Sequence, residues 1–288
     1  MKSRFLIAMC AMLMSPFAMA FQDELVAQDP SIAAYDKVIA GHQVKVVAFR
    51  AKLTEAKSSA ERRKLYDTES PKADNIVPDL KKIMTDHPKS DGAFASAKWI
   101  ASNTRGAHVQ MAVGVLAKDF ATKAGVGEVC LRMTRDRKIE TFKFIQQVMI
   151  QNTNRTDQGQ ACFALAKWYS GSAATLNRLM TTTDEKRLER MRKSTGEETI
   201  AFLKSQGNET LMKEALTHFK RVQQEFADVP YRRNSTLGAS SEGAVFEISN
   251  LQIGKKSPDI TAEDIDGVKF SLSDYLGKVV VLDFWGDW

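Results

Sequence analysis

The sequence predicts a mainly α-helical chain, either a helical repeat or a helix bundle, followed by the first strands of a smaller α/β unit. From about residue 30 to residue 250, apolar residues recur with helical spacing, and no segment sustains an alternation of apolar and polar residues. After Leu251 the pattern changes to turn-forming residues and short apolar runs that end in Val279–Trp285. We therefore expect a helical domain over residues 21–250 and a second unit over residues 251–288.

The composition is that of a globular protein. The chain has 288 residues, of which 43% are hydrophobic and 26% are charged, which argues against a fibrous or disordered chain. The formal net charge is +6, but the basic residues are interleaved with acidic ones; the densest basic cluster, Arg62–Lys64, stands beside Glu61 and Asp67. Because no basic patch with interleaved aromatic residues occurs, we predict no nucleic-acid partner.

Residues 1–20 have the pattern of a secretory signal peptide. Lys2 and Arg4 precede the apolar run Phe5–Met14, and Ala18–Ala20 gives the small-x-small cleavage pattern. This run is too short to span a bilayer, which takes about 20 residues, so we expect no integral membrane segment after cleavage. The prediction is an exported protein, periplasmic or otherwise extracytoplasmic, that loses Cys10 with its signal peptide.

Helix signals mark several segments of the middle region. Asp29 and Pro30 open a helix that we expect to reach about Ala60. The clearest helix is predicted over residues 209–227, capped by Asn208 and followed by a loop over residues 231–238. Its apolar residues are spaced along a single helical face: Leu211, Ala215, Phe219, Val222 and Phe226.

Two five-residue segments of the helical region are similar to each other, and we call this similarity the internal echo. Ala95–Trp99 matches Ala164–Trp168 with one difference in five residues, at positions 69 residues apart. This spacing is close to twice a repeat of about 34 residues and loosely resembles tetratricopeptide-type repeats. A non-repeating bundle explains the same residues equally well. In both interpretations we expect Trp99 and Trp168 to be core residues.

The helical region contains no recognisable catalytic or cofactor-binding motif. The four histidines are scattered, and neither a phosphate-binding loop nor a G-x-S-x-G motif occurs, so we predict no metal and no cofactor. Cys130 and Cys162 sit in apolar helical patterns, which favours two small buried side chains over a disulfide. Stacked helices often offer concave binding surfaces, so a protein partner of this region is one prediction.

The carboxyl-terminal segment has a denser set of motifs. Asp264–Val268 contains an Asp-Gly turn between two short extended segments. Phe270–Gly277 predicts a strand and a short capped turn that is closed by glycine. The run Val279–Trp285 predicts a strand that is buried on both faces of a sheet.

Together these motifs resemble the opening of the thioredoxin-like redoxins, specifically the exported thiol–disulfide oxidoreductases of the TlpA and ResA type within the AhpC/TSA thioredoxin-like superfamily. The resemblance covers residues 253–288. The matching residues are Gly254, Ser257, Pro258, Asp259, Asp264, Asp266, Gly267, Leu272 to Asp274, Gly277 to Val280, Leu282, Phe284, Trp285 and Trp288.

The resemblance implies an α/β thioredoxin-like domain that exchanges dithiols and disulfides with a disulfide-bearing protein substrate, without a cofactor. In that family a C-x-x-C motif directly follows the tryptophan that matches Trp288. Trp285 and Trp288 belong to the lead-in to that motif. The position of Asp283 is that of a buried acid in thioredoxins proper, which relays the proton of the resolving cysteine. Asp283 is therefore the candidate proton relay.

The sequence given ends before the C-x-x-C position, so we expect it to be an incomplete oxidoreductase, truncated in its redoxin domain. Two alternatives remain open. One is a non-catalytic helical-repeat binding module with a vestigial redoxin tail. The other is a peroxidase or antioxidant redoxin, although the P-x-x-x-T-x-x-C context of such enzymes does not occur around Phe284–Trp288. As written, this polypeptide is expected to show no dithiol chemistry.

Overall fold

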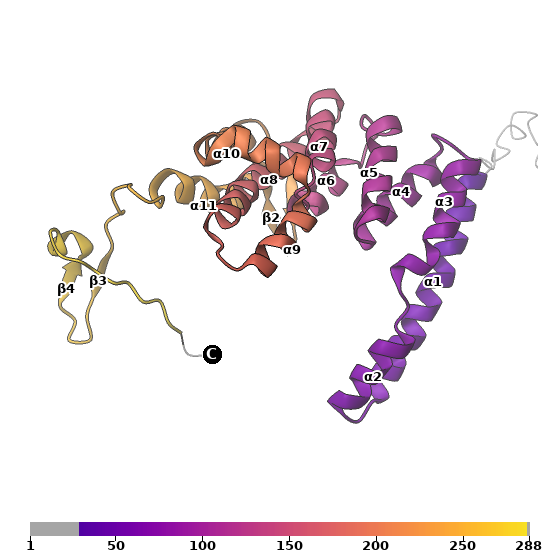
Figure 1. Ribbon diagram of the computed structural model, residues 1–288, viewed down its shortest axis with the longest axis horizontal. Helices are drawn as coiled ribbons and strands as arrows, with labels where there is room; N and C mark the ends of the chain where they lie inside the picture. Colours follow the sequence, from indigo (N-terminus) through magenta and orange to yellow (C-terminus); the bar gives the residue numbers. More distant parts are fainter. Residues whose placement is uncertain (1–28, 287–288) are drawn as a thin grey trace, which may run out of the picture.

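The computed structural model describes residues 29–286. Most of these residues are helical, and the strands form two small antiparallel pairs, which confirms the prediction of a mainly α chain with a few strands (Figure 1). The predicted signal peptide at residues 1–20, with Cys10, lies outside the described residues, as does Trp288. Among the described helices, none has the length and apolar character needed to cross a membrane.

The first predicted helix is divided in two. Helix α1 (Pro30–Glu55) begins as expected, with the Asp29 side chain accepting a hydrogen bond from the Ser31 N–H, but it ends before Ala60. Ala56 is extended, and helix α2 (Ser59–Glu69) follows. The cause is the Ser58 hydroxyl, which accepts from the Glu61 N–H and so caps a new helix at this point. The prediction of one helix to Ala60 was therefore wrong.

The next elements form the amino-terminal part of the core. They are η1 (Ala73–Ile76), α3 (Val77–Asp86), α4 (Asp91–Asn103) and α5 (Ala107–Asp119), and α4 packs against α1, α3 and α5. Gly92 allows the close approach of α1, because a Cβ at this position would overlap the Ser31 backbone. The Gly92 N–H donates to the buried Ser31 Oγ at 3.0 Å, which fixes the register of α1 on α4.

Helix α8 (Arg155–Thr181) lies at the centre of the second half of the helical region. It packs against α6 (Gly127–Arg132), η2 (Met133–Arg135), α7 (Ile139–Gln151) and α10 (Glu197–Glu225). Most of its middle is buried, and many of the buried residues are small: Gly159, Ala161, Cys162, Ala164, Ala166, Ser172 and Ala173. Small side chains on several sides let several neighbours approach the same helix.

Helix α10 follows α9 (Glu185–Thr195) and consists of two helical segments that meet at a kink. The first segment begins at Glu197, and the second begins after Gly207, where the sequence predicted a helix to start. Gly207 has φ 72° and ψ 161°, so it interrupts the helix at the place where Asn208 was predicted to cap it. The predicted apolar face after this kink is confirmed: Leu211, Ala215, Phe219, Val222 and Phe226 are all buried.

The predicted loop over residues 231–238 contains regular structure. The strands β1 (Pro230–Arg232) and β2 (Ser235–Thr236) pair with each other, and helix α11 (Leu237–Asn250) begins directly afterwards. The Thr236 hydroxyl accepts from the Ala239 N–H and caps α11. The turn residues of this segment thus mark a tight antiparallel pair, and the loop prediction was wrong at both of its ends.

The carboxyl-terminal segment stands away from the helices in Figure 1. Its elements are β3 (Thr261–Glu263), β4 (Lys269–Ser271) and the 3₁₀ turn η3 (Leu272–Tyr275). The predicted buried strand over residues 279–285 is not formed: these residues have no regular structure and are exposed, Val279 by 97%. A strand of this composition needs neighbouring strands and covering layers, and no described segment supplies them.

The two copies of the internal echo occupy different environments. Ala97 and Ala166 are both fully buried, and so is Trp168, which packs on Phe142 at a ring distance of 4.6 Å. Trp99 is only half-buried, with His42 against its ring. The core prediction holds fully for Trp168 and in part for Trp99. Whether the echo reflects true repeats stays a prediction.

The echo supplies a matched pair for a stability test. Replacing Trp168 by Ala leaves a large cavity in the core, so we expect a loss of about 3–5 kcal/mol in the free energy of unfolding. Trp99→Ala should cost about half as much or less, because that ring is partly exposed already. Urea unfolding followed by circular dichroism at 222 nm measures both. Equal losses would contradict the different burial of the two rings.

Candidate functional site: the carboxyl-terminal hairpin

The predicted Asp-Gly turn connects β3 and β4. The strands are antiparallel, with Thr261 opposite Ser271. One carboxylate oxygen of Asp264 accepts from the N–H groups of Asp266 and Val268, at 2.9 and 2.8 Å, and Gly267 takes the left-handed conformation with φ 78°. The short-range chemistry of the motif therefore builds the turn that the sequence predicted.

A second carboxylate joins the two ends of the motif. Asp259 accepts from the Ser273 N–H at 2.9 Å and from the Ser273 hydroxyl at 2.8 Å. The side-chain hydrogen bond first, and the backbone one second, lower the pKa of Asp259 below its ordinary value. The Leu272 N–H also donates to the Ile260 carbonyl at 2.9 Å. The structure thus brings together residues that lie 14 positions apart in the sequence.

The turn after β4 is capped reciprocally. The Ser271 side chain caps the start of η3, while the Asp274 carboxylate accepts from the Ser271 N–H at 2.8 Å. The Tyr275 ring stands edge-on to the Phe270 ring at 6.5 Å, and Gly277 closes the turn with φ 83°. The chain is therefore directed out of the hairpin at a defined point, immediately before the run Val279–Trp285.

The three site residues from the sequence are not brought together. Asp283 and Trp285 belong to the exposed stretch, and the side chain of Trp285 is 84% exposed. Trp288 lies outside the described residues. The role predicted for Asp283 depends on burial, which the described residues do not provide. Sequence reasoning missed the pairing of Asp259 with Ser273, although both residues belong to the motif.

The two described cysteines are separate thiols, as predicted. Both are free and buried, and burial raises both pKa values above the ordinary thiol value, to about 12 for Cys162. The Cys162 Sγ lies 3.7 Å from Nδ1 of His218, whose own pKa is lowered by burial. Because the thiolate is the reactive form, these two cysteines are poorly suited to exchange chemistry.

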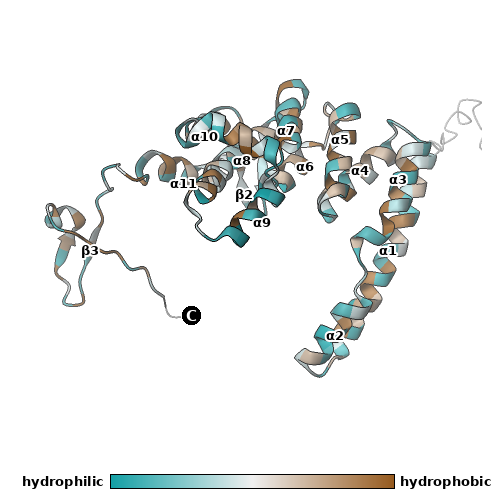
Figure 2. Cartoon of the chain, in the orientation of Figure 1, coloured by the Kyte–Doolittle hydropathy of each residue, from teal (hydrophilic) through white to brown (hydrophobic). Residues whose placement is uncertain are grey.

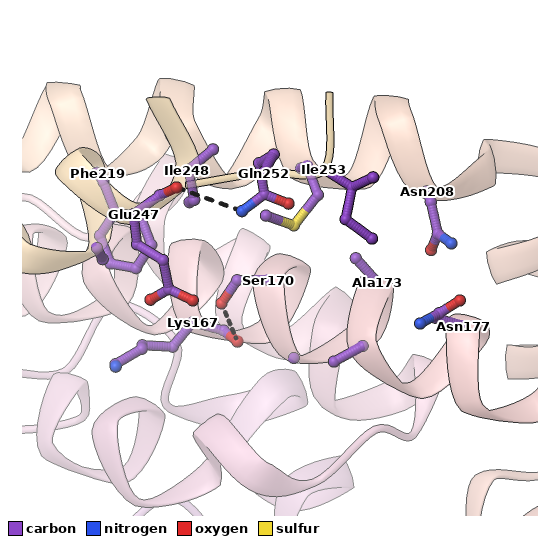
Figure 3. Close-up of a pocket in the computed structure, with 14 residues that line it drawn as sticks. Lys167, Ser170, Ala173, Asn177, Asn208, Phe219, Glu247, Ile248, Gln252 and Ile253 are labelled. Carbon is purple, nitrogen blue, oxygen red and sulfur yellow. Dashed lines mark hydrogen bonds between the residues drawn. The ribbon is translucent and has the colours of Figure 1, made fainter. Parts of the chain in front are cut away.

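The helical region has a groove beside the start of the carboxyl-terminal segment (Figure 3). Its volume is about 540 Å³, and it is bounded by α8, α10, α11 and Gln252–Ile253. Asn177 and Asn208 lie toward one end of the groove. Lys167 and Glu247 lie toward the other end, and Phe219 and Ile248 contribute apolar surface. Sequence reasoning did not predict this groove, because three helices and a linker assemble it.

No metal site is apparent in the described part of the chain. Within residues 29–286, the structure contains no group of three or more His, Cys, Asp or Glu side chains that could hold a metal ion.

A short part of this chain is similar to known thiol-disulfide oxidoreductases. A stretch of 47 residues, 16% of this chain, is 40% identical to the thiol-disulfide oxidoreductase ResA of Bacillus anthracis. A stretch of 42 residues is 40% identical to the enzyme of the same name from Geobacillus thermodenitrificans. These matches span 27% and 24% of the relatives' own lengths, so the chain covers about a quarter of each. No family model matches the chain. No solved structure matches it significantly.

The hairpin contacts predict a local effect of Asp259. Replacing Asp259 by Asn removes the charge that accepts both Ser273 hydrogen bonds, so residues 270–276 should exchange their amide hydrogens faster. Hydrogen exchange with peptide-level mass spectrometry measures this change. Asp266→Asn is the matched control, because it alters an exposed carboxylate in the same hairpin. Equal protection in both variants would show that the link does not hold η3.

The buried thiols make a prediction about reactivity. In the native chain, iodoacetamide should leave Cys130 and Cys162 unmodified at pH 8, and nearly so at pH 9.5, because their pKa values are raised by burial. In guanidinium chloride both should be alkylated rapidly. Mass spectrometry of the peptides reads each site separately. Fast native labelling of either cysteine would contradict the buried placement.

Proposed function

We propose that this protein is an exported thiol–disulfide oxidoreductase whose redoxin domain begins near residue 251. The main support for the proposal is that two findings agree. A stretch of the chain is 40% identical to enzymes of this name, and the redoxin motif residues interact with one another in the carboxyl-terminal hairpin. We place the similarity on this hairpin because it contains the family motif. The division into a helical domain and a redoxin domain is part of the proposal.

The proposed reaction uses a C-x-x-C pair that follows Trp288. The first cysteine, as a thiolate, attacks one sulfur of a substrate disulfide, and the other substrate sulfur leaves as a thiolate. The second cysteine then attacks the mixed disulfide, which releases the reduced substrate and leaves the pair oxidised. Two electrons pass from the enzyme dithiol to the substrate, and no cofactor takes part. Cys130 and Cys162 have no role in this scheme.

Asp283 is the proposed proton relay for the second cysteine. In this role its carboxylate accepts the proton as that cysteine becomes a nucleophile, which requires the carboxylate to be buried beside the pair. Burial of Asp283 would accompany the pairing of Val279–Trp285 with neighbouring strands of a completed sheet. Trp285 and Trp288 would then form part of the surface around the pair.

The test uses the protein encoded by the whole gene. The proposal requires cysteine codons at the first and fourth positions after Trp288, and it requires that the purified protein accelerates the reduction of insulin disulfides by dithiothreitol. A variant with both of these cysteines replaced by Ser should lose the acceleration. If this protein consumed a hydroperoxide with a single cysteine instead, the peroxidase alternative would replace the proposal. If no cysteine followed, the redox function would fail.

Asp283 predicts a graded effect in the same assay. We expect Asp283→Asn to slow insulin reduction at pH 7 by about tenfold or more, since a positioned base typically contributes this much. The deficit should shrink as the pH rises, because solvent then removes the thiol proton. Glu263→Gln, an exposed change in β3, serves as the control. A uniform loss at every pH would indicate a structural role only.

A second candidate function is protein binding by the helical region. The groove of about 540 Å³ favours it, because the groove combines apolar surface with the side-chain amides of Asn177 and Asn208. Such amides can donate to and accept from a peptide backbone. A photo-crosslinking residue at position 208 should capture a partner peptide, whereas the same residue at position 64 on α2 should not. Equal capture at both positions would argue against the groove.

A further inference from the structure

A small cavity beside helices α8 and α9 gathers positive charge. Its volume is about 240 Å³, and it lies between the segment that joins η2 to α7, the carboxyl-terminal part of α8 and the end of α9. Arg135 is the last residue of η2, Arg137 follows it before α7, and Arg178 comes from α8. The remaining lining residues are Asp136, Thr175, Met191, Ser194 and Thr195.

Within the described part of the chain, none of the three guanidinium groups forms an ion pair with a carboxylate. None of the ion pairs found among residues 29–286 includes Arg135, Arg137 or Arg178. Arg137 donates to the Thr134 carbonyl, which carries no full charge. Two arginines that face one cavity repel each other unless an anion lies between them.

Asp136, the acidic residue among those that line the cavity, is hydrogen-bonded to other groups. The Asp136 carboxylate accepts from the Gln110 side-chain amide and from the Thr141 hydroxyl, both at 2.8 Å, and from the Lys138 N–H at 3.1 Å. Asp136 thereby holds its segment against α5 and α7. It still raises the pKa of Arg137 through space, but it forms no ion pair with that group.

Helix α8 is shaped to receive Arg137. Gly171 lies in the middle of this helix, where glycine costs up to about 1 kcal/mol relative to alanine. A Cβ at Gly171 would overlap the Arg137 guanidinium, so the glycine lets this group lie directly against the helix backbone. The segment of Arg137 is fixed from the other side as well, because the Ile139 N–H donates to the buried Thr199 hydroxyl at 3.0 Å.

Arg137 is partly buried beside the positive charge of Arg178. Burial first, and the neighbouring Arg178 as well, lower the pKa of Arg137 to about 10 despite the opposing effect of Asp136. An anion between the guanidinium groups would offset both effects. The hydroxyls of Thr175 and Ser194 donate back to the Gly171 and Met191 carbonyls, and the guanidinium groups are the charged donors that line the cavity.

We propose that this cavity, the Arg137 cavity, binds a phosphate-class oxyanion: inorganic phosphate or the phosphate group of a monoester. Guanidinium groups donate paired hydrogen bonds that match phosphate oxygens. A phosphate dianion also neutralises the charge of three guanidinium groups more fully than a carboxylate with one negative charge. The volume of about 240 Å³ suits such a group. Helix α9 adds net positive charge nearby and is strongly hydrophilic in Figure 2. It has two acidic residues, Glu185 and Glu189, and five basic ones: Lys186, Arg187, Arg190, Arg192 and Lys193.

The test is calorimetric titration of the full chain with sodium phosphate at constant ionic strength. We expect one site, and we expect Arg178→Ala to weaken phosphate binding by about tenfold or more, as the loss of a charged hydrogen bond predicts. Arg178 is exposed, so this variant should fold. Arg190→Ala is the matched control: it removes the same charge from an exposed position on α9 outside the cavity, and it should change the affinity less than about twofold.

A second variant tests the glycine. Gly171→Ala improves helix propensity but displaces Arg137, so it should weaken phosphate binding while circular dichroism shows an intact helical fold. Absence of phosphate binding in the wild-type chain would overturn the proposal. Equal weakening by Arg178→Ala and Arg190→Ala would do the same, since it would indicate a diffuse surface charge effect.

Two sources of the phosphate group are distinguished by parallel titrations. One titration uses glycerol 3-phosphate, and the other uses phosphatidylcholine vesicles that contain phosphatidic acid. Binding of the soluble monoester with the same dependence on Arg178 supports a soluble ligand. Vesicle binding that depends on Arg178 and that free phosphate displaces supports a lipid headgroup in the same cavity. Vesicle binding alone, insensitive to Arg178, contradicts the proposal.

Discussion

The packing of neighbours around helix α8 is the constraint on which the rest of the helical region depends. A helix can be enclosed on several sides only if its side chains leave room, and α8 meets this condition with glycines and alanines along its length. Phe226 lies directly against Gly159, and Arg137 lies directly against Gly171. The large side chains of this helix, Phe163 and Trp168, then fill the spaces between its neighbours.

Both cavities with functional interest border on this helix. The groove of Figure 3 forms where α10 and α11 lie across one side of α8, and the Arg137 cavity forms where the loop before α7 meets another side. The polar groups in these cavities come from elements far apart in the sequence, such as Asn177 with Asn208, or Arg137 with Arg178. The central helix therefore positions the lining of both cavities as well as the core.

The carboxyl-terminal hairpin is held by hydrogen bonds within itself and not by packing around a central helix. Its turns are built by hydrogen bonds between near neighbours, Asp264 with Val268 and Ser271 with Asp274, and the Asp259–Ser273 contact joins its two ends. Such contacts form without a surrounding core. The following run, Val279–Trp285, has no such local partners, and it remains exposed although its composition is that of a buried strand. The redox proposal therefore rests on the hairpin and on the similarity to ResA enzymes.

Features that depend on neighbouring residues follow from the sequence alone. The helical class, the start of α1, the buried face of Leu211–Phe226, the Asp-Gly turn and the separate burial of Cys130 and Cys162 were all predictable, because periodicity, capping and turn chemistry act locally. The division of α1 from α2 was also local and could have been read from Ser58 and Glu61. Three features became visible in the folded chain, because each depends on which distant segments meet: the contact of Arg137 with Gly171, the groove, and the exposure of Asp283. Helix caps and turns can be predicted from neighbouring residues, but the partners of a strand cannot, since the hydrogen bonds of a strand go to another segment.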